Sequence, residues 1–417
     1  GAAGEGGYAP GADGLRMGVS EASATYRLAG DAVPADDGVP QGYKRTEVGL
    51  IPEDWGVVNL SGLSEVLTGL TYRPSDVDSG GVLVLRSSNV QEGRLAFDDN
   101  VYVLSRAVAD NVLVQPGDIL VCVRNGSRDL IGKSALIPEI NAPVAFGAFM
   151  AVLRSSEPSF VHHAFRSEVV QKQVREQLGA TINQITRAGF DSFLLPAPSR
   201  LTERTAIAEA LSDADALIES LQQLIAKKRA LKQGAMQALL TGRQRLPGYA
   251  SEWGRMRLGD VVKLIRDNVV PMSLPNETFL HFSLPAFDDG RVAVKELGSV
   301  IGSNKFRVPQ NAILVSKLNP RIPRVWTPKV IPKNSVCSTE FLVFVPAVGM
   351  RREFISCICS SPAFCEQMEL AATGTTGSHQ RMNPSDALDI RVQVPVDASE
   401  QTAIATVLSD MDAEIDA

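Results

Sequence analysis

The stretch RNGSRDLIGKSAL at 124–136 has the composition of a phosphate-binding loop. Such a loop needs glycine, four residues and then Gly-Lys-Ser or Gly-Lys-Thr, so that its backbone amides curl around a phosphate. Gly132, Lys133 and Ser134 supply the ending, but the position of the first glycine holds Ser127. The residues from Ser134 onward also predict a strand, where the motif needs a helix. We therefore predict a β-hairpin with a polar tip and no nucleotide site.

The tip of this hairpin has two interpretations. It is a solvated turn, or it presents Arg124, Asn125, Arg128 and Lys133 to an anionic surface. The second interpretation gains support from the repeat described below, because basic and amide side chains recur at the equivalent place.

Length and composition indicate a globular protein of two or three domains. The chain has 417 residues, of which 44% are hydrophobic and 6% aromatic, which is ordinary for a packed fold. No run approaches the roughly 18 apolar residues of a membrane span, and we find no N-terminal signal pattern. We expect a cytoplasmic protein that does not contact a membrane.

The five cysteines form an odd set without C-x-x-C spacing, namely Cys122, Cys337, Cys357, Cys359 and Cys365. Histidine is scarce, with four residues in the chain, so the ligands of a zinc site are not apparent. We predict buried thiols, and we expect neither a metal nor a cofactor.

The formal net charge of −6 argues against a nucleic-acid partner until its distribution is considered. Residues 1–43 have six acidic and two basic side chains, and residues 400–417 have five acidic and no basic ones. The negative charge therefore lies at the termini. The body of the chain is nearly neutral, which is compatible with a local basic face.

The chain repeats itself with an offset of 194 to 198 residues. Three pairs of segments show the repeat: WGVVNLSGL from Trp55 and WGRMRLGDV from Trp253, ILV from Ile119 and from Ile313, and ERTAIA from Glu203 and EQTAIA from Glu400. In the first copy, short apolar runs predict strands near 82–85, 118–123, 144–146 and 192–196, and 168–178 predicts a helix. Each copy is therefore a β-rich segment followed by a helix, which gives an α+β fold.

A long helix is predicted from Leu201 to about Leu240, where Thr241 and Gly242 end it. Its apolar residues step by four and three, which is typical of a coiled-coil seam. The expected partner is the repeated helix that begins at Glu400, and the other interpretation is a long core helix. The seam residues are Ile207, Leu211, Ala214, Ile218, Leu221 and Ile225 in the first helix and Ile404, Leu408, Met411 and Ile415 in the second.

This organisation predicts five regions. They are a poorly ordered N-terminal extension at 1–43, a first β-rich domain at 44–200, a central helix at 201–245, a second β-rich domain at 246–399, and the start of a second long helix at 400–417. The second helix ends sooner than the first copy does, so we expect that it is truncated or that a partner chain completes the coil.

Four segments resemble the specificity subunits of type I restriction–modification enzymes. GYKRTEVGLIPEDW at 42–55 is similar to the family's entry to a target-recognition domain, and the GDILV and GK-x-AL pattern at 117–136 to its hairpin. LPAPSRLTERTAIA at 195–208 is similar to the junction into the family's long helix, and ALKQGAMQALLTG at 230–242 to the end of that helix. The resemblance covers about residues 42–417.

The resemblance implies a non-catalytic subunit with two target-recognition domains, which read the two halves of a split target in double-stranded DNA. It implies that the long helices form an antiparallel coiled coil with a pseudo-twofold tandem repeat and fix the spacing of the halves. The implied partners are two methyltransferase subunits, which methylate adenine, and motor and endonuclease subunits that join through the complex. The closest approach to a methyltransferase motif, NPSD at 383–386, lacks the second proline and the aromatic residue.

Three groups of side chains have the chemistry that reads DNA. Arg and Lys pair with guanine, and Asn and Gln with adenine, whereas phosphates accept hydrogen bonds from any of these and from Ser or Thr. The groups are Arg86, Ser88 and Asn89; Arg124, Asn125, Arg128 and Lys133 with the counterparts Lys317, Asn319, Arg321 and Arg324; and Thr181, Asn183 and Gln184 with the counterparts Ser378, His379, Gln380 and Arg381.

Two other functions stay open at this point. A protein-interaction scaffold that touches no DNA predicts that charge reversal at Arg124 and Arg128 has no effect on DNA retention, and that binding shows no steep salt dependence. A fused nuclease or methyltransferase would need catalytic motifs that we do not find in the sequence.

Overall fold

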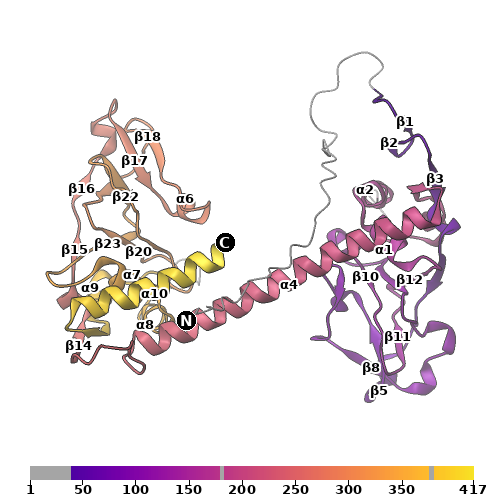
Figure 1. Ribbon diagram of the computed structural model, residues 1–417, viewed down its shortest axis with the longest axis horizontal. Coiled ribbons are helices and arrows are strands. Elements are labelled where there is room, and N and C mark those ends of the chain that lie inside the picture. Colours follow the sequence, from indigo (N-terminus) through magenta and orange to yellow (C-terminus); the bar gives the residue numbers. More distant parts are fainter. Residues whose placement is uncertain (1–38, 179–182, 375–379) are drawn as a thin grey trace, which may run out of the picture. The chain divides into compact units, whose positions relative to one another are not determined.

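The computed structural model describes residues 39–178, 183–374 and 380–417. The chain divides into two units, unit 1 at Gly1–Ala214 and unit 2 at Asp215–Ala417. Each unit mixes helices and strands (Figure 1), so the fold is α+β. The predicted extension at 1–43 lies outside the described residues up to residue 38.

In its described residues, unit 1 begins with a hairpin and continues with a four-stranded, a three-stranded and two two-stranded sheets, and with three short α-helices that precede a long one. Its strands are β1 (Tyr43–Thr46), β2 (Gly49–Pro52), β3 (Trp55–Asn59), β4 (Glu65–Thr68), β5 (Val77–Leu85), β6 (Val90–Gln91), β7 (Arg94–Leu95), β8 (Val101–Val103), β9 (Ile119–Cys122), β10 (Ser134–Leu136), β11 (Val144–Phe146), β12 (Met150–Arg154) and β13 (Leu194–Pro198). Its helices are α1 (Pro158–Arg166), α2 (Glu168–Gln177), α3 (Arg187–Ser192) and the first part of α4 (Leu201–Leu239). The predicted hairpin is confirmed, because Ser134 of β10 pairs with Val121 of β9.

Strand β9 is buried on both faces because its alternate side chains enter two different cores. Ile119 and Val121 pack with Phe165 in the core that α1, α2 and α3 cover. Leu120 packs with Phe146 of the neighbouring three-stranded sheet. A continuous apolar run is what a strand between two packed layers requires, and it fixes the point at which the hairpin tip leaves the sheet.

Unit 2 follows the end of α4. Its strands are β14 (Trp253–Arg257), β15 (Val262–Ile265), β16 (Asn268–Val269), β17 (Thr278–Phe282), β18 (Val294–Leu297), β19 (Lys305–Arg307), β20 (Ile313–Ser316), β21 (Val325–Trp326), β22 (Ser335–Ser338), β23 (Phe341–Pro346) and β24 (Arg391–Pro395). Its helices are α5 (Leu258–Val261), α6 (Leu284–Asp288), α7 (Arg352–Ser360), α8 (Pro362–Leu370), α9 (Pro384–Asp389) and α10 (Ala398–Asp416). Strand β20 has the same two-sided burial as β9, with Ile313 in one core and Leu314 in the other.

The sheets of the two units have the same order of strands. The order β10-β9-β12-β4 in unit 1 corresponds to β21-β20-β23-β15 in unit 2. A parallel pair recurs as β11 with β5 and as β22 with β17. A two-stranded sheet recurs as β13 with β3 and as β24 with β14. Positions at the ends of β9 and β20 can therefore be compared directly.

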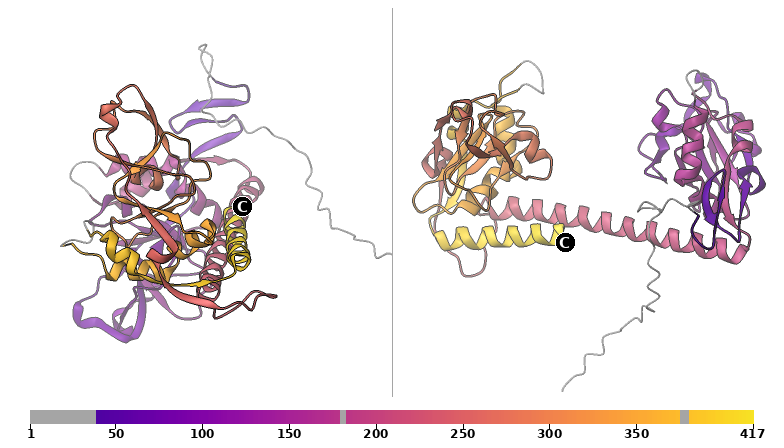
Figure 2. Two further views of the ribbon diagram at one scale, coloured as in Figure 1. Left: turned by 90° about the vertical axis from the view of Figure 1, so that its left-hand side faces the viewer. Right: turned by 90° about the horizontal axis from the view of Figure 1, so that it is seen from above.

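Helix α10 lies antiparallel beside the last turns of α4 within unit 2 (Figures 1 and 2). Two ion pairs set this register, Lys228 Nζ with Glu414 Oε2 at 3.0 Å and Lys232 with Asp412. Met236, further along α4, enters the core that also contains the buried residues of α10.

The predicted seam is wrong for the middle of α4. Leu211, Ile218 and Leu221 are 45%, 52% and 48% exposed, and Ala214 is also exposed. The physical reason is the register of α10. Its ion pairs are with Lys228 and Lys232 of α4, and its buried residues share a core with Met236 and Leu239, so α10 lies beside the last turns of α4 and not beside the earlier ones. The remaining members of the seam are the half-buried Ile207, Ile225, Met411 and Ile415 and the buried Ile404 and Leu408.

A buried carboxylate fixes the start of α10. Glu400 is fully buried and accepts hydrogen bonds from Arg245 Nε and Nη2 at 2.6 and 2.7 Å and from Trp253 Nε1 at 3.4 Å. In unit 1, Trp55 Nε1 donates to Glu203 at 3.0 Å at the start of α4. In each unit a tryptophan in the strand β3 or β14 thus donates a hydrogen bond to a glutamate near the start of the following helix, α4 or α10.

Among the helices within the described ranges, none combines the length and the apolar composition that crossing a membrane requires.

We predict that Glu400→Ala lowers the free energy of unfolding by about 2–3 kcal/mol, because it removes charge-assisted hydrogen bonds and leaves Arg245 without its partner. Asp410→Ala is the matched control on the exposed face of α10 and should stay within about 0.5 kcal/mol of the parent. Chemical denaturation measures both, and equal losses would contradict the structural role of Glu400.

Candidate nucleic-acid interface

In unit 1 the structure brings the second and third predicted groups together. Arg124, at the end of β9, forms an antiparallel bridge with Gln184. The Ile185 amide donates to the Val123 carbonyl oxygen at 2.8 Å, which extends this pairing. Arg128 Nε donates to Asn183 Oδ1 at 2.9 Å. Arg124, Arg128, Asn183 and Gln184 are all exposed, so basic and amide side chains share one surface.

Unit 2 contains the same arrangement. Leu318 forms an antiparallel bridge with Arg381. The Asn319 amide donates to the Gln380 carbonyl oxygen at 2.8 Å, and the Met382 amide to the Lys317 carbonyl oxygen at 2.9 Å. The predicted residues Thr181, Ser378 and His379 lie outside the described residues, and Arg321 is exposed.

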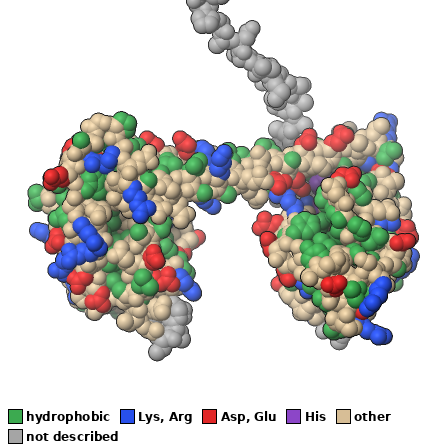
Figure 3. Space-filling view, turned by 90° about the horizontal axis from the view of Figure 1, so that it is seen from below, with side chains coloured by type: hydrophobic (Ala, Val, Ile, Leu, Met, Phe, Trp, Pro, Cys, Tyr) green, Lys and Arg blue, Asp and Glu red, His purple; other side chains and the backbone are tan. Residues whose placement is uncertain are grey.

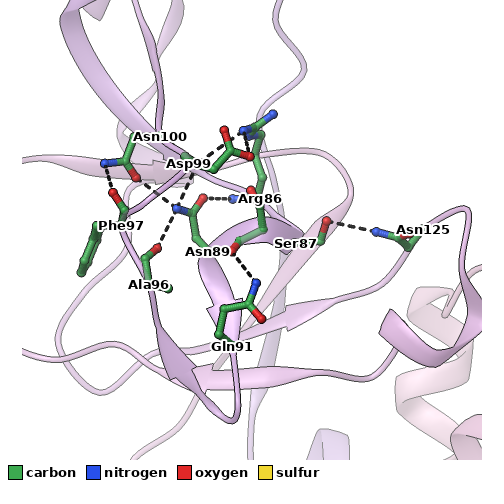
Figure 4. Close-up of polar contacts among 10 residues, drawn as sticks. Arg86, Ser87, Asn89, Gln91, Ala96, Phe97, Asp99, Asn100 and Asn125 are labelled. Carbon is green, nitrogen blue, oxygen red and sulfur yellow. Dashed lines mark hydrogen bonds and ion pairs between the residues drawn. The ribbon is translucent and has the colours of Figure 1, made fainter. Parts of the chain in front are cut away.

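The first predicted group meets the second through one hydrogen bond, from Asn125 Nδ2 to Ser87 Oγ at 3.0 Å (Figure 4). Arg86 forms an ion pair with Asp99 at 2.9 Å and keeps 34% of its side chain exposed. Ser88 is half-buried, and its Oγ has no hydrogen-bond partner among the described residues. Arg86 and Ser88 therefore border the surface that carries Arg124.

The prediction that Asn89 contacts DNA is wrong. Its side chain is fully buried. Asn89 Oδ1 accepts from the Arg86 amide at 3.0 Å, and Nδ2 donates to the Ala96 carbonyl oxygen at 2.8 Å and to Asn100 Oδ1 at 3.1 Å (Figure 4). A buried amide whose donors and acceptor are satisfied is a structural residue, here one that ties the loop before β8 to the end of β5.

The prediction for Arg324 is also wrong. Its guanidinium makes two parallel bonds to the Asp288 carboxylate, at 2.7 and 2.9 Å, and its side chain is only 14% exposed. The hydrogen bond from Arg324 lowers the pKa of Asp288, so the pair stays charged at neutral pH. The pair engages Nε and Nη2, and the low exposure of the side chain leaves little of Arg324 to present to DNA.

Three further predicted residues, Lys133, Lys317 and Asn319, are half-buried and lie near the ends of the strands that carry the predicted contact residues. Burial raises the pKa of the Cys122 thiol, and the positive charge of Lys133 opposes that shift. Asn319 adopts a left-handed backbone, with φ at +48°, which asparagine tolerates better than most residues. These residues shape the tips.

The prediction of buried thiols is confirmed for Cys122, Cys337 and Cys359, whereas Cys357 and Cys365 are half-buried. Burial raises the pKa of Cys337 to about 12 and of Cys357 and Cys365 to about 11. These thiols stay protonated at neutral pH, so they are poor nucleophiles and poor metal ligands. Within the described ranges, no three His, Cys, Asp or Glu side chains are grouped as a metal site requires.

Sequence reasoning missed Phe149, which lies beside Arg124. The ring is 57% exposed, and the Arg124 guanidinium carbon lies 5.2 Å from its centre. A cavity of about 550 Å³ opens between this ring and Tyr72, Arg86 and Ser88. A phenylalanine next to the strand β12 reads as core from the sequence, so no local signal indicated its exposure.

Phe149 is not the only exposed hydrophobic side chain of unit 1. Val77 and Phe97 are exposed besides Phe149. One face of this unit, on the right of Figure 3, shows hydrophobic side chains gathered between charged ones. Surfaces that combine apolar contacts with basic side chains suit the major groove, where thymine presents a methyl group among polar base edges.

Residues 52–227 match the family model described as type I restriction modification DNA specificity domain. The resemblance inferred from the sequence is thereby confirmed, and two curated relatives agree with it. The type I restriction enzyme StySPI specificity subunit of Salmonella potsdam is 28% identical over 206 residues, which are 46% of this chain and 44% of the relative.

The type I restriction enzyme EcoKI specificity subunit of Escherichia coli (strain K12) is 27% identical over 247 residues, which are 55% of this chain and 52% of that relative. The chain therefore spans about half the length of the curated relatives it matches. The crystal structure of the S subunit of a type I restriction–modification system from M. genitalium has the same fold, with a TM-score of 0.54, 15% identity and coverage of 87% of this chain and 90% of that one.

The turn that presents Phe149 depends on a close approach of two glycines. A Cβ added at Gly69 would lie 2.2 Å from the Gly147 carbonyl oxygen, and the Leu70 amide donates to the Phe146 carbonyl oxygen at 2.7 Å. Only glycine fits at position 69, because the obstructing atoms are backbone atoms that cannot rotate away.

We predict that Gly69→Ala lowers the free energy of unfolding by roughly 1–3 kcal/mol, as overpacking does elsewhere. Gly62→Ala is the control, because a Cβ there meets nothing within 4 Å. If thermal denaturation shows Gly69→Ala to be as stable as Gly62→Ala, the turn at 147–149 is not fixed by this contact.

Proposed function

We propose that the chain is the specificity subunit of a type I restriction–modification complex, which binds double-stranded DNA and performs no catalysis itself. Units 1 and 2 each read one half of a split target. The observation that carries this proposal is the recurrence of one backbone bridge, Arg124 with Gln184 and Leu318 with Arg381, at the same place in both units. The match of residues 52–227 to the family model supports it.

We also propose the domain boundaries and the helix pairing that the sequence predicted. The target-recognition domains are residues 44–200 and 246–399, and the helices at 201–245 and from 400 onward form an antiparallel coiled coil in a pseudo-twofold tandem repeat. The shared strand orders support the repeat. The ion pairs of Lys228 and Lys232 with α10 support the helix pairing.

The partners of this subunit are two methyltransferase subunits and, through the complex, motor and endonuclease subunits. Apolar side chains exposed on α4 support a docking role for this helix. An apolar stripe on a helix that no other part of the protein covers is typical of a contact with another protein. The exposed residues of this stripe include Leu217 and Leu224, which are 60% and 47% exposed.

A protein-interaction scaffold is the competing function, and DNA retention separates the two. The double variant Arg124→Glu with Arg128→Glu should weaken binding of the target duplex by roughly tenfold or more, because contacts to base edges each contribute about 1–3 kcal/mol. The logarithm of affinity should also fall less steeply with the logarithm of salt concentration, by about 0.9 for each lost phosphate contact.

The matched control reverses the same amount of charge at Lys227 and Arg229, which are exposed on α4. Fluorescence anisotropy across a salt series measures all three proteins. If the two double variants bind DNA equally well, or if the parent chain binds no duplex at any salt concentration, the scaffold is the better description.

A further inference from the structure

Phe149 in unit 1 and Glu340 in unit 2 occupy the same structural position. Each directly precedes a strand, β12 or β23, whose first residue pairs with the last residue of the buried strand: Met150 with Cys122, and Phe341 with Ser316. The Phe149 carbonyl oxygen accepts from the Val123 and Arg124 amides at 3.0 and 3.2 Å, and the Glu340 carbonyl oxygen from the Lys317 amide at 2.9 Å.

In each unit one arginine lies beside Phe149 or Glu340. The two arginines belong to different partners of the backbone bridge. In unit 1 the arginine is Arg124, at the end of β9, and the opposite residue is Gln184. In unit 2 the arginine is Arg381, on the segment before α9, and the residue at the end of β20 is Leu318. The number of arginines at the bridge is therefore the same, although their places are exchanged.

The side chain at position 149 or 340 matches the arginine next to it. The Phe149 ring holds the Arg124 guanidinium at 5.2 Å through a cation–π contact, which fixes the plane of the guanidinium without using its N–H groups. Among the described residues, no carboxylate forms a salt bridge with Arg124.

In unit 2 the same role falls to a carboxylate. Arg381 Nε donates to both Glu340 oxygens, at 3.3 and 3.2 Å, and the two side chains are 48% and 26% exposed. An ion pair between half-exposed groups stabilises the fold little, so its main effect is to hold the direction of the Arg381 side chain.

We infer that Phe149 and Glu340 are positioning residues, each orienting one arginine that reads a guanine in its half of the target. An oriented arginine suits this task, because guanine is recognised by two parallel hydrogen bonds to O6 and N7, which demand a fixed fork. The inference rests on the proposed function, since it assigns a base to the same surface.

The test uses the full chain co-expressed with its methyltransferase subunit, with N6-methyladenine mapped across a genome. Phe149→Leu removes the π face and keeps an apolar side chain, whereas Phe149→Tyr keeps the ring. We expect Phe149→Leu to lower the preference for one guanine in one half of the methylated motif by about 5- to 150-fold. Phe149→Tyr should keep that preference.

The reciprocal variants address unit 2. Glu340→Ala should relax one guanine in the other half by a similar factor, and Glu340→Gln should retain part of the preference, because its carbonyl oxygen still accepts from Arg381. The controls are Tyr43→Ala, an exposed aromatic side chain of unit 1, and Asp267→Asn, which breaks the Arg307–Asp267 pair of unit 2. Thermal midpoints of all variants establish that each protein is folded.

Relaxation confined to one guanine in one half supports the inference. An unchanged motif in both Phe149→Leu and Glu340→Ala overturns it, as does relaxation at a base other than guanine, or an equal loss of methylation at every site. The proposed function fails separately, because in that case the parent chain itself would give no split methylated motif.

Discussion

A short antiparallel backbone pairing is the constraint on which both candidate sites depend. In each unit it joins the end of a strand that is buried on both faces to the segment that leads into a short helix. Strands β9 and β20 cannot slide by one residue without turning their core side chains toward the wrong layer. The bridge residues therefore project from a rigid base, whereas the loops beyond them can differ in sequence without disturbing either core.

The sequence predicted the elements that its apolar pattern encodes. The apolar run at 118–123 predicted a strand, and the repeat located the equivalent strand from Ile313. The structure then showed that both strands lie between two cores. The repeat also led to Arg124, Gln184 and Arg381, because equivalent offsets placed polar groups at equivalent strand ends. That these groups share a surface was not predictable locally, since about 60 residues separate the partners of each bridge.

Three residues show where sequence reasoning failed and why. Asn89 lies in a polar run, but the loop at 96–100 closes over it and satisfies its amide. Arg324 has the sequence context of a basic tip residue, but in the structure it forms an ion pair with Asp288, which lies 36 residues earlier. Phe149 reads as core because apolar residues surround it in sequence, yet its ring supports Arg124 at the surface. In each case a long-range contact decided the role of the side chain.

The long helix was predictable in length but not in its contacts. The composition of 201–239 favours helix throughout, and the structure shows 39 continuous helical residues. Which part of its apolar stripe is covered depends on the ion pairs of Lys228 and Lys232 with α10. The earlier turns of α4, where Leu211, Ile218 and Leu221 are exposed, are the place at which we propose that partner subunits bind.

Exchange of one recognition segment tests the central claim most directly. Residues 251–399 would be replaced by the corresponding segment of a type I specificity subunit with a different target, and the chain co-expressed with its methyltransferase subunit. Mapping of N6-methyladenine should then show one half of the split motif altered and the other half unchanged. A methylated sequence that stays the same, or that changes in both halves, would contradict the account.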